Sequence, residues 1–189
     1  MTTKLLILDN RAELYRDHLA PQFPEVDFLM AADRESAEAL MGEAEILFTI
    51  GPLLTKDMID GAGRLKWLQS MISGIDFLTP LLADRPDVML SACRGVQGPE
   101  MSEVTAYHLL CLNRQGRRLM RNQEAHVWDR FKPRVLDGMT VGILGVGALA
   151  PPVARLCQAF GMTTWGFSRP VRKVDGFDRM IHRDQPLGE

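Results

Sequence analysis

Short apolar runs alternate with helical patterns along the first ninety residues, and this alternation limits the fold more than any other feature of the sequence. Strands made almost entirely of apolar residues have to be covered on both faces, and helices between consecutive strands supply that cover. The sequence therefore predicts an α/β fold with a parallel sheet. The runs predict five strands, at residues 4–9, 26–30, 46–49, 65–69 and 88–91.

Helical patterns fill the intervals between these strands. We expect helices at residues 11–19, 33–41 and 55–62. Asp33 and Thr55 stand where the second and third of these helices begin. A side-chain oxygen at that position can accept a hydrogen bond from a backbone N–H of the first turn, so both residues are predicted helix caps.

A longer helix is predicted to begin at Pro99, because proline lacks the N–H that would have no partner in a first helical turn. Glu100 and Glu103 lie in that turn, and several arginines lie towards the other end, so both placements complement the helix dipole. These arginines are Arg114, Arg117, Arg118 and Arg121. We expect one long helix that joins two domains, at residues 1–98 and 99–189.

A second βαβ pattern follows a polar loop. The strand at residues 139–144 leads into a glycine turn, a helix at 151–160 and another strand at 163–167. This is the order and length of a dinucleotide-binding unit. Gly145 permits the tight turn, and Gly147 lets the backbone approach a pyrophosphate. A purely structural βα turn is the alternative interpretation.

Three small or apolar residues complete the turn. Ala150 stands where the fingerprint has its third glycine, and it still allows the helix to pack closely. The backbone amides of Ala148 and Leu149 precede two prolines, so they remain available to a phosphate. Beyond the helix, a basic cluster follows the second strand, where an acidic residue would bind the ribose of NAD. The cluster comprises Ser168, Arg169, Arg172 and Lys173. These groups favour the 2′-phosphate of NADP, with a solvated basic loop as the alternative.

Composition excludes several classes of protein. The formal net charge is −2 and the basic residues are scattered, which gives no case for binding to nucleic acid or an anionic membrane. No apolar run reaches the roughly 20 residues of a membrane span. The three cysteines, Cys93, Cys111 and Cys157, are an odd number at wide spacings, so they cannot all be paired and form no metal-ligand spacing. We expect a cytoplasmic protein.

Four segments, in this order, resemble the D-isomer-specific 2-hydroxyacid dehydrogenases. They are residues 65–76, Arg94 with Gly95, residues 99–103 and residues 140–147. The resemblance implies a flavodoxin-like substrate domain at residues 1–98 and a Rossmann-type cofactor domain at 99–189. It also implies a dimer that forms through the long helix. Within the family, the NADPH-using glyoxylate/hydroxypyruvate reductases are the nearest in character.

The resemblance also assigns a substrate site. It implies that the backbone N–H groups of Ser73, Gly74 and Ile75 bind the substrate carboxylate, and small residues do let consecutive amides converge on an anion. A tight turn after a buried strand is the alternative. We expect Asp76 to cap a helix rather than to act as an acid. Trp128 matches a tryptophan near the family's subunit interface, although a place in the core is an equal alternative.

The catalytic groups of the family are not matched in this sequence. An arginine polarises the substrate carbonyl, and a histidine supported by a carboxylate acts as acid and base. The resemblance implies that these groups follow residue 189, so we expect an incomplete cofactor domain and an inactive chain. The histidines present do not occupy the matching position, and we expect His108 to be packed or at an interface. They are His18, His108, His126 and His182.

These observations lead to one expected activity and one alternative. We expect an oxidoreductase that reduces a small 2-oxo acid to a D-2-hydroxy acid, with NADP(H) favoured over NAD(H) and without a metal. The alternative is a non-catalytic remnant or a module that senses NAD(P)H by binding it.

Overall fold

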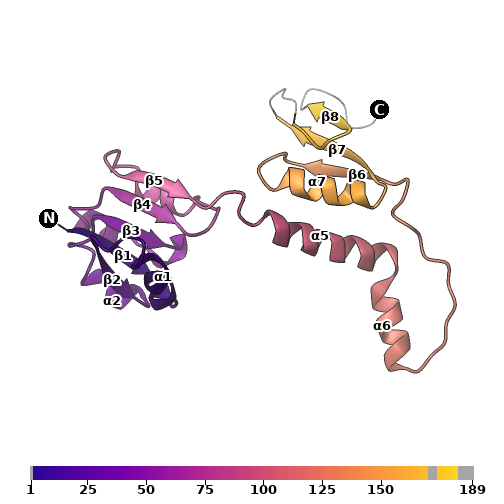
Figure 1. The fold of residues 1–189 in the computed structure, drawn as a ribbon, viewed down its shortest axis with the longest axis horizontal. Coiled ribbons are helices and arrows are strands. Elements are labelled where there is room, and N and C mark those ends of the chain that lie inside the picture. Colours follow the sequence, from indigo (N-terminus) through magenta and orange to yellow (C-terminus); the bar gives the residue numbers. More distant parts are fainter. Residues whose placement is uncertain (1, 170–173, 183–189) are drawn as a thin grey trace. The chain divides into compact units, whose positions relative to one another are not determined.

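The computed structural model describes residues 2–169 and 174–182 (Figure 1). Internal contacts divide the chain into two compact units, Met1–Arg94 and Gly95–Glu189. The sequence had placed the division after residue 98.

The first unit is a five-stranded parallel sheet with helices in its connections. The strands follow the order β2-β1-β3-β4-β5, which is the doubly wound order of flavodoxin-like folds. The predicted α/β class and flavodoxin-like topology are therefore confirmed. The strands are β1 (Thr3–Leu8), β2 (Val26–Ala31), β3 (Ile46–Thr49), β4 (Trp67–Ser70) and β5 (Met89–Ala92). The helices are α1 (Ala12–Leu19), α2 (Arg34–Glu38), η1 (Gly51–Leu53), α3 (Lys56–Gly61) and α4 (Leu78–Leu81).

Side-chain caps begin two of these helices as predicted. The Asp33 carboxylate accepts a hydrogen bond from the Ser36 N–H at 2.9 Å, and the Ser36 hydroxyl donates to it as well. These bonds hold the pKa of Asp33 below its usual value. Thr55 Oγ1 accepts the Met58 N–H at 3.3 Å. The predicted cap at Asp76 is wrong, because α4 begins after Phe77 and has no side-chain cap.

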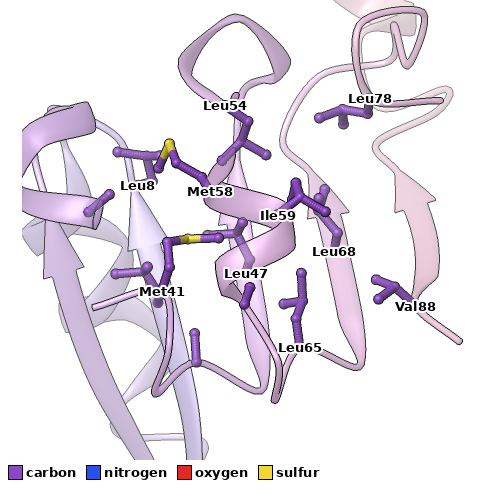
Figure 2. Packing of buried hydrophobic residues seen from close by; sticks show 14 of the residues in the cluster. Leu8, Met41, Leu47, Leu54, Met58, Ile59, Leu65, Leu68, Leu78 and Val88 are labelled. Atoms are coloured by element: carbon purple, nitrogen blue, oxygen red, sulfur yellow. The ribbon is translucent and has the colours of Figure 1, made fainter. Parts of the chain in front are cut away.

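Alternate residues of the central strand β1 fill two cores. Leu6 and Leu8 face the larger core, whereas Leu5 and Ile7 pack with Ala12 of α1 on the other face. A strand buried on both faces explains the continuous apolar run in the sequence. Figure 2 shows the larger core, where strand leucines meet side chains of α3. The labelled members are Leu8, Met41, Leu47, Leu54, Met58, Ile59, Leu65, Leu68, Leu78 and Val88.

The second unit pairs helices with a parallel sheet in the order β6-β7-β8. Its strands are β6 (Thr140–Leu144), β7 (Thr163–Ser168) and β8 (Arg179–His182), and its helices are α5 (Gly98–Asn113), α6 (Gly116–Glu124) and α7 (Ala150–Ala159). The last strand predicted from the sequence was at residues 163–167, so β8 is an additional strand. It pairs with β7 from Arg179 opposite Trp165, where the guanidinium carbon lies 4.6 Å from the indole ring centre.

The long helix expected from Pro99 is two helices, and this prediction is corrected. Gln115 between α5 and α6 has φ 53°, in the left-handed region, which ends a helix. Gly116 then approaches α5 so closely that a Cβ atom there would lie 3.3 Å from the Cα of Cys111. Arg117 and Arg118 consequently begin α6 instead of ending a longer helix.

A local motif ends α7 at Gly161, as predicted. Gly161 has φ +75°, and its N–H donates to the Gln158 carbonyl at 2.9 Å. The Met162 N–H donates to the Cys157 carbonyl at 3.1 Å. This pair of bonds is the Schellman motif, which satisfies the last carbonyls of a helix and needs a residue that tolerates positive φ. Burial raises the pKa of the Cys157 thiol inside this unit.

We expect backbone amides of the second unit to exchange hydrogen faster than those of the first. The hydrophobic cluster of its described residues contains three buried side chains, Leu136, Cys157 and Met162, against sixteen in the larger cluster of the first unit. Among the described residues no strand pairs with the second edge of β6. Leu144 on that strand is 82% exposed. Local opening is easier where few apolar contacts oppose it. Hydrogen exchange followed by mass spectrometry checks this, and equal protection of β1 and β6 in a monomer would contradict it.

Candidate coenzyme and carboxylate sites

The glycine turn after β6 has the backbone geometry that its sequence predicts. Gly145 has φ +91°, a conformation that side-chain-bearing residues rarely adopt, and its N–H donates to the Phe167 carbonyl at 3.0 Å. Val146 then turns inward and is buried. It lies so close to Gly166 of β7 that a Cβ atom there would come within 2.8 Å of the valine Cγ1. The turn is therefore anchored to the neighbouring strand.

The residues before α7 present open backbone amides. A Cβ atom on Gly147 would meet nothing within 4 Å, so a ligand can approach the backbone at this point. The Ala150 N–H is used, since it donates to the Gly147 carbonyl at 3.1 Å. Within the described part of the chain, the N–H groups of Ala148 and Leu149 have no such acceptor. These two amides precede a ten-residue helix, and a helix start favours an anion.

The basic cluster is only partly described. Ser168 is buried at the carboxyl end of β7, and Arg169 directly after it is exposed. Arg172 and Lys173 lie outside the described residues. Ser168 Oγ lies 3.5 Å from Nδ1 of His182, which ends the neighbouring strand β8. Sequence reasoning did not connect His182 with this cluster, because the contact depends on a strand that was not predicted.

A carboxylate at the opposite end of the same strands fixes their pairing. Asp178 accepts hydrogen bonds from the Thr164 N–H at 2.7 Å and from the Thr164 hydroxyl at 2.8 Å. The Gln158 amide of α7 also donates to it, at 3.4 Å. These bonds, with the backbone N–H of Thr164 contributing most, hold the pKa of Asp178 below its usual value. The register that places Ser168 beside His182 is set in part here.

The candidate carboxylate loop connects β4 with α4. Several bonds fasten it: the Met71 N–H donates to the Thr49 carbonyl of β3 at 2.9 Å, and the Ser73 hydroxyl donates to the Cys93 carbonyl at 2.6 Å. On the far side, the Ile75 carbonyl accepts the N–H groups of Leu78 and Thr79. The loop therefore has defined contacts on both sides of Gly74.

Gly74 itself is exposed, and a Cβ atom there would meet nothing within 4 Å. Among the described residues, no carbonyl accepts the N–H groups of Gly74 and Ile75. Two consecutive open amides form a small anion-binding concavity. The loop follows β4 at the carboxyl edge of the sheet, where doubly wound folds bind their ligands.

Three of the histidines form no ion pair with a carboxylate of the described residues: His18, His108 and His126. His18 and His126 are exposed. His108 is also exposed, with its ring centre 5.2 Å from that of Tyr107, so it is not a packed residue of this chain. Its place at an interface remains a prediction. The described residues contain no cluster of three or more metal-binding side chains.

Trp128 lies in the irregular segment after α6 and is 91% exposed. The alternative that it belongs to the core of the chain is therefore wrong. Its neighbour Asp129 binds Arg118 Nε at 2.8 Å, and this guanidinium holds the pKa of Asp129 below its usual value. The Arg118 guanidinium carbon also lies 4.3 Å from the ring centre of Phe131. These contacts hold the segment against α6.

A flavodoxin-like unit followed by a strand, glycine turn and helix defines a nucleotide-dependent α/β protein of the two-domain dehydrogenase class. The profile of the D-isomer specific 2-hydroxyacid dehydrogenase NAD binding domain matches residues 106–188. A crystal structure of a D-isomer specific 2-hydroxyacid dehydrogenase family protein from Aeromonas salmonicida is 33% identical, with a TM-score of 0.86 over 96% of this chain. These two matches support a place for the chain in the D-isomer specific 2-hydroxyacid dehydrogenase family.

Two further relatives show how the similarity is distributed. D-3-phosphoglycerate dehydrogenase of Rattus norvegicus is 33% identical over 116 residues, which are 60% of this chain and 22% of the relative. The NADPH-dependent glyoxylate/hydroxypyruvate reductase of Sinorhizobium meliloti, in complex with NADP and sulfate, shares the fold with a TM-score of 0.77 and 24% identity. It is covered to 56%, and the Aeromonas structure to 58%, so the chain spans somewhat more than half of these two solved structures and about a fifth of the rat enzyme. No helix among the described residues is long and apolar enough to cross a membrane.

Proposed function

We propose that this chain supplies the carboxylate site and the coenzyme site of an enzyme that reduces a small 2-oxo acid to a D-2-hydroxy acid. The observation that carries the proposal is the turn between β6 and α7, where Ala148 and Leu149 present open amides to an anion. The coenzyme pyrophosphate binds there, beside Gly145 and Gly147. The substrate carboxylate binds the amides of the loop at residues 73–75.

NADPH is the proposed coenzyme in preference to NADH. Arg169 is exposed directly after the buried Ser168, where the adenosine ribose lies in Rossmann domains. A guanidinium there binds a 2′-phosphate, and the basic residues at 172 and 173 add to the same charge. The Gly145–Leu149 turn and Arg169 fit the coenzyme, which supplies the hydride when bound.

The catalytic arginine and histidine are assigned to no described residue, and we propose that the 189-residue chain binds coenzyme without turnover. Titration of the purified chain with NADPH and with NADH tests coenzyme binding, and an assay of hydroxypyruvate reduction tests the absence of turnover. Binding without reduction is the expected result. Failure to bind either coenzyme would contradict the proposal. The alternative, a module that senses NAD(P)H, predicts binding but no response of the loop at residues 73–75 to a 2-oxo acid.

A cytoplasmic location is proposed, and the three free cysteines agree with it.

A homodimer is the proposed assembly. The helices α5 and α6 and the segment that carries Trp128 expose many large apolar side chains, which marks an interaction surface. They include Met101, Val104, Tyr107, Leu110, Leu112, Leu119, Met120, Val127 and Trp128. The segment at residues 126–133 and α6 also enclose a hollow of about 750 Å³. A second copy of the chain is the occupant implied by the family.

Replacing Trp128 by aspartate is expected to weaken the dimer by at least about 100-fold, because a charge would enter an apolar interface centre. Sedimentation velocity over a range of protein concentrations measures the change. Phe23→Asp is the matched control, since Phe23 is an exposed aromatic residue of the first unit. An unchanged dimer in Trp128→Asp would exclude this surface, as would equal effects of the two substitutions.

A further inference from the structure

The bonds around the candidate carboxylate loop are unevenly distributed. After Gly74, the Ile75 carbonyl is held three times, by the N–H groups of Leu78 and Thr79 and by the Thr79 hydroxyl at 3.0 Å. Before Gly74, the Ser73 hydroxyl reaches across to β5 and donates to the Cys93 carbonyl at 2.6 Å. The Ser73 side chain thus links the loop to β5, while the Ser70 hydroxyl of β4 donates to the Ile72 carbonyl at 2.9 Å.

The strand end that accepts this bond is itself fixed. The Cys93 N–H donates to the Ser70 carbonyl at 3.2 Å, which extends the pairing of β4 with β5 by one rung. Gln69 Nε2 donates to the same carbonyl at 2.6 Å and lies 3.6 Å from Cys93 Sγ. The Ser70 carbonyl therefore accepts two hydrogen bonds, and one of them holds the backbone of Cys93, whose own carbonyl accepts the Ser73 hydroxyl.

A chain of side-chain hydrogen bonds continues from Gln69 along the two strands. Ser91 of β5 donates to Gln69 Oε1 at 2.6 Å, and the Trp67 indole N–H donates to Ser91 Oγ at 2.6 Å. Gln69 and Ser91 are direct cross-strand partners. Hydrogen bonds in series orient and strengthen one another in a partly buried setting. The acceptor for Ser73 thus rests on a network that spans most of the length of β4.

We propose that the Ser73 hydroxyl is a positioning residue that orients the Gly74 and Ile75 amides towards the substrate carboxylate. Glycine has the widest backbone freedom of any residue, so an untied segment before Gly74 would point its N–H groups in many directions. The bond from the Ser73 hydroxyl to β5 removes part of that freedom before the ligand arrives, in addition to the bond from Ser70 to the Ile72 carbonyl, and this favours binding. The inference rests on the proposed function, because it presumes that these amides bind the carboxylate.

The test is a titration of the ¹⁵N-labelled chain with sodium oxamate, an unreactive mimic of a 2-oxo acid, followed by amide chemical shifts. In the unsubstituted chain, the Gly74 and Ile75 signals are expected to shift in a saturable manner. Ser73→Ala is expected to weaken oxamate binding about 5- to 10-fold, the loss of one hydrogen bond. Ser73→Thr keeps a hydroxyl and should restore affinity to within about 2-fold. The thermal unfolding midpoint should barely change in either variant.

Thr79→Ala is the matched control, because it removes a hydroxyl from the same loop while two N–H groups still hold the Ile75 carbonyl. It is expected to change oxamate affinity by less than about 2-fold, since the acceptor keeps its partners. Equal affinities of the Ser73→Ala and unsubstituted chains would overturn the positioning role alone. An equal loss of oxamate affinity in Ser73→Ala and Thr79→Ala would also overturn the positioning role. If Gly74 and Ile75 do not respond in the unsubstituted chain, the proposed carboxylate site itself fails, and the inference fails with it.

Discussion

Arg169→Ala is expected to weaken NADPH binding about 10- to 100-fold and to leave NADH binding nearly unchanged. A hydrogen bond to a charged group contributes roughly 1.5–3 kcal/mol, and a phosphate gains further from the planar guanidinium. Arg169 is exposed at the carboxyl end of β7, beside Ser168, and so is free to meet the 2′-phosphate that distinguishes the two coenzymes. Isothermal titration calorimetry with each coenzyme measures both affinities.

The second unit contains a matched control for this substitution. Arg179 begins β8 at the opposite end of the sheet, where it lies over the Trp165 ring. Arg179→Ala removes the same charge from the unit but should not alter the preference between NADPH and NADH. Salt dependence gives a further check, because a phosphate contact weakens as ionic strength rises. Equal losses for both coenzymes in Arg169→Ala would show that the arginine serves the pyrophosphate or the fold.

Arg85→Met is expected to lower the free energy of unfolding of the first unit by about 2–4 kcal/mol, because it removes three hydrogen bonds from a charged group to backbone carbonyls. The guanidinium donates to the carbonyls of Ile59 and Ala62 at the end of α3, at 3.1 and 3.2 Å. It also donates to the Leu65 carbonyl at 3.2 Å, just before β4. Only 17% of its side chain is exposed. The Arg85 side chain therefore donates hydrogen bonds to carbonyls at the end of α3 and in the turn that follows it.

Methionine retains the length and most of the volume of arginine, so this substitution tests the hydrogen bonds more than the packing. Urea denaturation followed by the amide signals of Leu47 and Leu68 reports on the first unit alone. Asp87→Asn is the control: it removes the ion pair at 2.9 Å but leaves the three carbonyl contacts in place. Because Asp87 is exposed, its loss should cost much less. Similar losses in both variants would assign the stability to the ion pair.

Several features of the fold and site are determined by nearest neighbours in the sequence. The caps at Asp33 and Thr55 need only the first turn of a helix, and the sequence predicts both correctly. Gly145 and Gly161 likewise adopt the positive φ that their positions require. The five strands of the first unit were predicted because each is a short, mostly apolar run, and burial on both faces favours such runs.

Other features depend on contacts between distant segments. The strand β8 contains Arg179 and His182, so its composition does not indicate a strand; pairing with β7 and the bonds of Asp178 make it one. The break at Gln115 accompanies the close approach of Gly116 to α5. Helix propensities of single residues do not predict such a contact. Asp76 has the residue type of a cap, but α4 begins after it.

The same distinction divides the candidate site. The sequence by itself determined where the open amides lie, because Gly74 and the turn at residues 145–149 are local patterns with local geometry. Only the tertiary structure decided what surrounds them. Ser73 meets Cys93 because β4 and β5 pair in one particular register, and Ser168 meets His182 because β7 and β8 do the same. Strand register is a property of two segments at once, so it cannot be derived from either segment alone.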